Sequence, residues 1–154
     1  MAYPNVALID ALRKTYEHLK TSPLYSWGHL GSCNCGHLAQ VVTQKSAKEI
    51  HEAALRRAGD WGEVVVDHCP QSHLPVDYIL SEMYALGLTP ADIEHFEDLS
   101  DPEILERIVS PGVYLARNDK SHVLLYIQGW IEHLQAALTN SVVQLPREPL
   151  LKAG

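Results

Sequence analysis

Basic side chains are scarce in this sequence. Lys and Arg together number 12 against 19 Asp and Glu, which gives a formal net charge of -7. Proteins that bind phosphate backbones or anionic membranes present a concentrated positive surface, and this composition does not supply one. We therefore expect neither nucleic acid nor a membrane as a partner.

Long apolar runs and a secretory leader pattern are also missing. A membrane-spanning helix needs about 20 consecutive, mostly apolar residues, and no stretch here approaches that length. The first twenty residues do not combine a basic segment, an apolar run and a small-residue cleavage site. Only three cysteines are present, an odd number that excludes a fully paired disulfide framework. These observations predict a location in the reducing cytoplasm.

Several sequence motifs that indicate nucleotide binding or hydrolysis are absent. The sequence contains neither G-x-x-x-x-G-K followed by Ser or Thr nor G-x-G-x-x-G, the loops that cradle phosphates. It also lacks the H-E-x-x-H pattern of zinc proteases and the G-x-S-x-G turn that carries a nucleophilic serine. Any chemistry must therefore come from another group of residues.

The periodicity of apolar residues predicts helices. Apolar side chains recur at helical spacing over 5–20, 75–86 and 119–138, and capping signals at Ser46, Thr89 and Ser100 open further helices. With 154 residues, of which 46% are hydrophobic, the chain suits one compact domain. We predict an all-α fold, a single-domain array of five to seven short helices over 1–138. An extended C-terminal tail follows over 139–154.

Three local features qualify this prediction. The β-branched run Val64–Val66 favours a short extended segment near 63–68. Residues 113–127 fit either a hairpin or the start of the last helix, and the helical period that continues past 127 favours the helix. Gly129 lies inside that helix, where glycine costs helix propensity, so we expect another helix to cross close to it.

All three cysteines fall in two short segments that also carry histidines, around 29–37 and 68–73. Thiolate and imidazole are the ligands that zinc and iron prefer. The leading hypothesis is therefore a zinc or iron site between the two segments. Its candidate ligands are Cys33, Cys35, His37, His68, Cys69 and His73.

Two alternatives remain open. Cys35 precedes or begins a helix, where the helix dipole lowers a thiol pKa, so it is a candidate nucleophile with His37 as the base for a small-molecule substrate. The patterned helices also suit a module that binds a protein partner, including a second copy of itself, without catalysis. The sequence leaves the choice among these functions open.

Overall fold

The computed structural model describes residues 1–56, 59–69 and 71–143. All regular secondary structure within these residues is helical, which confirms the predicted all-α fold class. The helices are α1 (Val6–Thr21), α2 (Asn34–Thr43), α3 (Ala47–Ala54), α4 (Trp61–Val66), α5 (Pro75–Ala85), α6 (Pro90–Asp98), α7 (Pro102–Ile108) and α8 (Lys120–Val143).

Helix starts follow local signals in the sequence. Asn5 caps α1 by accepting a hydrogen bond from the backbone N–H three residues later. Ser46 with Glu49, and Thr89 with Asp92, form reciprocal capping boxes at the starts of α3 and α6. These side chains satisfy backbone N–H groups that have no partner inside the helix.

The expected extended segment near 63–68 is wrong, because α4 occupies most of it. Asp60 caps this helix by accepting from the backbone N–H of Glu63. Trp61, Val64 and Val65 share the buried face, a spacing that only a helical turn provides. Burial of this face outweighs the modest strand preference of β-branched residues.

The last helix decides between the two interpretations of residues 113–127. Residues 113–119 form a loop and α8 begins at Lys120, so the hairpin does not form. The helix continues to Val143, beyond the predicted end at 138, and the rest of the predicted tail lies outside the described residues. A Cβ at Gly129 would lie 2.4 Å from Ile108 Cγ2, so the expected close crossing is present and involves α7.

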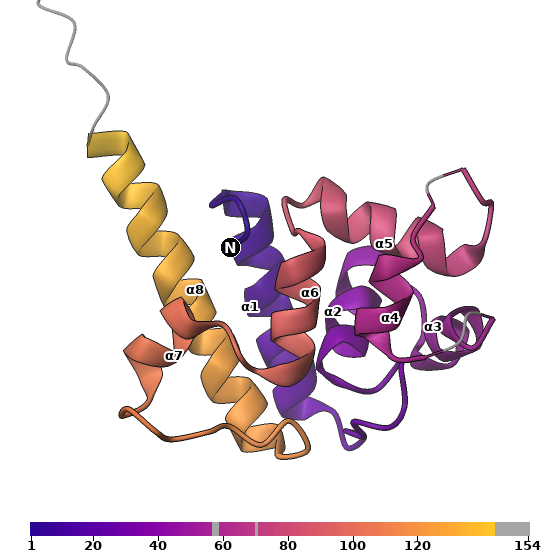
Figure 1. The fold of residues 1–154 in the computed structure, drawn as a ribbon, viewed down its shortest axis with the longest axis horizontal. Helices are drawn as coiled ribbons and strands as arrows, with labels where there is room; N and C mark the ends of the chain where they lie inside the picture. The colour runs from indigo at the N-terminus through magenta and orange to yellow at the C-terminus, as the bar shows by residue number, and fades with distance from the viewer. Residues whose placement is uncertain (57–58, 70, 144–154) are drawn as a thin grey trace, which may run out of the picture.

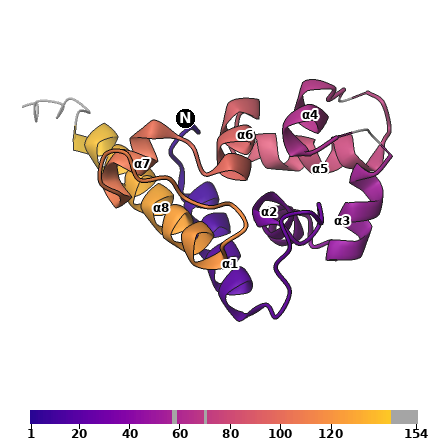
Figure 2. The same ribbon diagram turned by 60° about the horizontal axis from the view of Figure 1, so that its bottom comes forward.

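The helices pack around α1 and α2. α1 lies between α8 and α2, and α7 packs on α8 (Figure 1). α2 also contacts α3, α5 and α6, and the view in Figure 2 places α3 at the end of the molecule opposite α8. Among the described helices, none has the length and apolar character that crossing a membrane requires. Because α2 contacts α1, α3, α5 and α6, its first turn, where the Cys/His sequence lies, is inside the fold.

Candidate functional site

The cysteines of the first segment belong to the start of α2. Cys33 is the N-cap, and its Sγ accepts a hydrogen bond from Gly36 N at 3.3 Å. The Sγ of Cys35 lies 3.6 Å from the carbonyl oxygen of Ile93 on α6. Both side chains are buried in the core, so these thiols pack between helices.

Burial reverses the expected effect of the helix terminus on these thiols. Desolvation raises the pKa of Cys33 to about 11 and raises the pKa of Cys35 well above its ordinary value. The lowered thiol pKa expected from the helix dipole is therefore wrong, since an apolar surrounding disfavours the thiolate. Cys35 is fully buried and its neutral thiol is favoured, and the cysteine-nucleophile hypothesis stays a prediction.

His37 is buried on α2 and contacts a histidine that the sequence analysis did not single out. Its Nδ1 lies 3.0 Å from Nδ1 of His18 on α1, and its Nε2 lies 3.2 Å from the carbonyl oxygen of Leu24. Desolvation lowers the pKa of His37 to about 4. The ring is therefore neutral near pH 7, and it lies between α1 and the loop that follows α1.

The second predicted segment is organised by a buried carboxylate. Asp77 accepts hydrogen bonds from the backbone N–H of Cys69 at 3.3 Å and from the Ser72 hydroxyl, and its Oδ1 lies 3.3 Å from His68 Nδ1. Cys69 and His73 are exposed, unlike the thiols of α2. Asp77 stands in the first turn of α5, where a carboxylate is favoured by the helix dipole.

The predicted metal ligands are thus distributed over different surroundings. Within residues 1–56, 59–69 and 71–143 no group of three or more His, Cys, Asp and Glu side chains is placed to hold a metal ion. His37 instead meets His18, and His68 meets Asp77. The zinc or iron site on the six named residues stays a prediction.

A buried polar network behind the first segment was missed by the sequence analysis. Asn34 donates its amide hydrogens to the carbonyl oxygens of Phe96 and Glu97, at the end of α6. The Glu97 carboxylate accepts from the backbone N–H groups of Trp61 and Gly62, which begin α4. Burial raises the pKa of Glu97 to about 7. No sequence motif marks these residues, because the partners in each hydrogen bond lie 35 or more positions apart in the chain.

Two glycines make the same region unusually compact. A Cβ at Gly31 would lie 1.8 Å from the backbone oxygen of Ala47, and one at Gly36 would lie 2.5 Å from that of Leu30. His51 on α3 adds a further tie, since its Nδ1 accepts a hydrogen bond from Leu30 N at 3.1 Å. The Gly, Cys and His residues of 29–37 therefore fix the loop between α1 and α2.

That loop carries Trp27, which forms one wall of a surface pocket of about 520 Å³. We call it the Trp27 pocket. It is lined by Trp27, Asp98, Leu115, Ala116, Arg117 and Asn118. The guanidinium carbon of Arg117 lies 3.8 Å from the centre of the Trp27 ring, and Arg117 also pairs with Asp98.

The Trp27 pocket joins segments that are distant in the sequence. The hydroxyl of Tyr25 donates to the carbonyl oxygen of Arg117, which ties the two loops together. The Trp27 Nε1 atom is buried and has no hydrogen-bond acceptor among the residues described.

Comparison of this chain with models of known protein families, with curated protein sequences and with solved structures finds no match.

Proposed function

We propose that this domain binds a small molecule that carries both a carboxylate and an ammonium group, of the amino-acid class, in the Trp27 pocket. The observation that carries the proposal is the Arg117 side chain, held across the face of Trp27 and beside Asp98. The pocket is an open hollow of about 520 Å³, which gives room for a small ligand that remains partly exposed to solvent.

The two charged side chains supply opposite halves of such a recognition site. An arginine presents five N–H donors in a plane, and the contact with Asp98 uses Nη1 alone. The remaining donors suit a ligand carboxylate, which arginine binds in a bidentate manner. Asp98 in turn offers its oxygens to a ligand ammonium group.

The ion pair between Arg117 and Asp98 does not oppose ligand entry strongly. Both side chains are about half exposed, at 43% and 53%. Exposed ion pairs contribute only about 0–1 kcal/mol because water screens them. A ligand that offers each group a new partner can therefore replace the direct contact at little cost.

The close packing of the loop behind the pocket supports the same proposal. Binding is weakened when side chains and loops must be ordered, and a preformed wall reduces that cost. The contacts of Gly31, Gly36 and His51 hold the loop that carries Trp27. The Trp27 ring, held under Arg117, adds an aromatic wall to the pocket.

Isothermal titration calorimetry with each of the twenty amino acids tests the proposal. We expect at least one to bind the wild-type chain, with affinity at least tenfold weaker in Arg117→Gln. The matched control is Arg107→Gln, which removes an exposed arginine of α7 outside the pocket. Asp98→Asn should lower the affinity for the amino acid that binds, but it should leave the affinity for the deaminated analogue of that amino acid unchanged.

Two results would contradict the proposal. One is the absence of heat from all twenty amino acids with folded wild-type protein. The other is equal affinity in Arg117→Gln and wild type, which would place any binding elsewhere on the surface.

A further inference from the structure

His18 and His37 form a pair of imidazoles that the Trp27 pocket does not use. Their Nδ1 atoms are 3.0 Å apart and their ring centres 5.0 Å apart, with the planes tilted by 60°. One ring is buried on α2 and the other is exposed on α1. The two Nδ1 atoms thus face each other between α1 and α2, one ring buried and the other at the surface.

The surroundings of His37 determine which of its nitrogens is available. Nε2 lies 3.2 Å from the carbonyl oxygen of Leu24, which can only accept, so Nε2 carries the hydrogen. In the neutral ring Nδ1 is then unprotonated, and its lone pair is directed at His18. Metal-binding histidines are commonly oriented in this way, with the second ring nitrogen donating to a carbonyl oxygen.

The position beside His18 is open to solvent and offers further oxygen donors. A hollow of about 350 Å³ is lined by His18, Gln40, Val41, Gln44, Lys45 and Ser46. The amide nitrogens of Gln40 and Gln44 donate to the backbone carbonyls of Gly31 and Val41, at 2.7 and 2.6 Å. Each amide oxygen is therefore the atom left to bind a cation, together with water.

The spacing of the two nitrogens selects among metal geometries. With metal–nitrogen bonds of about 2.0–2.1 Å, nitrogens 3.0 Å apart subtend about 95° at the metal. Adjacent ligands of square-planar or octahedral ions make about this angle, and copper(II) and nickel(II) favour tetragonal nitrogen and oxygen sites. A tetrahedral zinc ion would require the two nitrogens to separate further.

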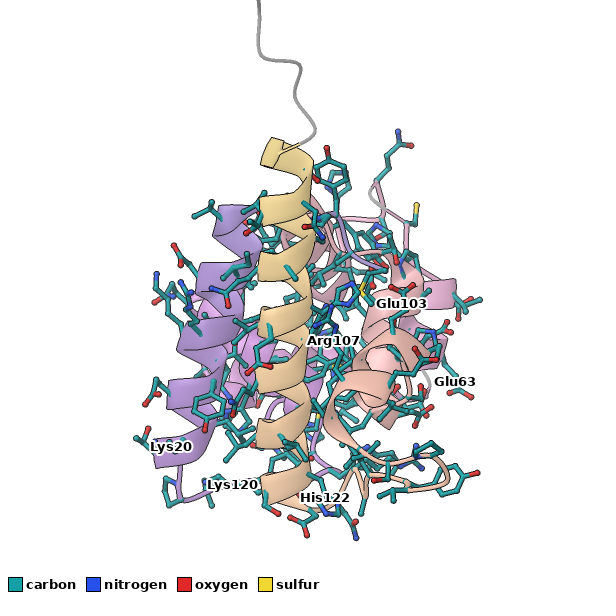
Figure 3. The ribbon with its side chains drawn as sticks, turned by 90° about the vertical axis from the view of Figure 1, so that its left-hand side faces the viewer. Lys20, Glu63, Glu103, Arg107, Lys120 and His122 are labelled. Atoms are coloured by element: carbon teal, nitrogen blue, oxygen red, sulfur yellow. The ribbon has the colours of Figure 1, made fainter. Side chains whose placement is uncertain are left out.

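Two lysines near the histidine pair are positively charged, as a metal ion is, and would repel it at short range. Both ammonium groups have other partners. The Lys120 ammonium donates to the carbonyl oxygens of Lys20 and Ser22, at the end of α1 (Figure 3). The Lys45 ammonium lies 5.9 Å from the centre of the Tyr78 ring. Tyr25 stacks on His37 and adds no charge near pH 7.

We infer that His18 and His37 together bind a divalent first-row metal ion of the copper(II) or nickel(II) kind, with Gln40, Gln44 and water completing its coordination. The site keeps one residue of the sequence-based metal hypothesis, His37, and replaces the cysteines by His18. It does not depend on ligand binding in the Trp27 pocket. Metal entry requires that the hydrogen of His18 move from Nδ1 to Nε2 and that the exposed His18 ring turn, so that both Nδ1 lone pairs point at the ion rather than along the line between the two nitrogens.

Titration with copper(II), nickel(II) and zinc(II) salts at pH 7.5 tests the inference. The protein carries Cys69→Ser in all samples, because an exposed thiol also binds these ions. We expect one copper(II) per chain with an affinity in the micromolar range, and an electron paramagnetic resonance spectrum split by two nitrogen nuclei. His18→Gln should weaken copper(II) binding at least tenfold.

His18 is exposed, so its replacement leaves the fold intact, whereas a variant of buried His37 carries a folding risk. The matched control is His95→Gln, which removes a partly exposed histidine on α6 and should bind copper(II) like the parent. Absence of copper(II) binding by the folded parent, or equal binding by His18→Gln, would overturn the inference.

Discussion

Replacing Gly36 by alanine sets two physical effects against each other. Gly36 lies in the first turn of α2, and alanine is the better helix former by about 1 kcal/mol in a helix interior. Helix propensity alone therefore predicts a gain in stability. The added Cβ would lie 2.5 Å from both the carbonyl oxygen of Leu30 and the carbonyl carbon of Gly31.

The steric contact of the added Cβ, rather than helix propensity, should determine whether Gly36→Ala raises or lowers the free energy of unfolding. Carbon and oxygen atoms of proteins do not approach to 2.5 Å without a bond, and both neighbours are backbone atoms that cannot rotate away. Overpacking of this kind costs about 1–3 kcal/mol, and more where the backbone must shift. Because both neighbours are backbone atoms we take the upper end of this range, about 3 kcal/mol, and subtract the propensity gain of about 1 kcal/mol. We therefore expect Gly36→Ala to lower the free energy of unfolding by about 2 kcal/mol.

Two further glycines of the same segment provide the comparison. A Cβ at Gly31 would lie 1.8 Å from the Ala47 oxygen, so Gly31→Ala should cost more, about 3 kcal/mol or above. A Cβ at Gly28 would meet nothing within 4 Å, and Gly28→Ala should change stability by less than about 0.5 kcal/mol.

Urea unfolding followed by circular dichroism measures all three variants, with equal m-values required for comparison. If Gly36→Ala is as stable as the wild type or more so, while Gly28→Ala behaves as expected, the close packing of this loop is refuted.

Three further predictions follow from the surroundings of single side chains. Under reducing native conditions iodoacetamide should modify Cys69 alone, because the two thiols of α2 are buried, and mass spectrometry should find three labels only after unfolding in urea. Desolvation lowers the pKa of His37 from 6.5 to about 4, so the unfolded chain binds the extra proton first and stability should fall as pH decreases from 6.5 to 4. Allowing for solvent screening, we expect the free energy of unfolding to fall by about 1–2 kcal/mol over this pH range in the wild type and not in His37→Gln. Parallel pH profiles of stability for the two proteins would contradict this. Asp77→Asn should lower stability by about 1.5–3 kcal/mol in urea unfolding, since the carboxylate accepts several hydrogen bonds, and Ser72→Ala should cost less; equal losses would contradict the central place of Asp77.

Much of the fold could be predicted because its signals are local. A capping residue and the helix that it starts are neighbours in the chain, so Asn5, Ser46 and Thr89 mark helix starts without knowledge of the rest of the molecule. The expected extended segment near 63–68 is wrong for the complementary reason, since α4 occupies most of it. Its helix is stabilised by burial of Trp61 and two valines against α6, and that contact has no local signature.

The sequence by itself determined the helical class, most helix boundaries and the position of the Cys/His segments, because apolar spacing and capping act over about four residues. Tertiary structure alone decided what those segments do. It buried two thiols, joined His37 to His18, and brought Trp27 and Arg117 together from opposite parts of the chain. Such contacts depend on how whole helices pack, so no spacing along the chain encodes them.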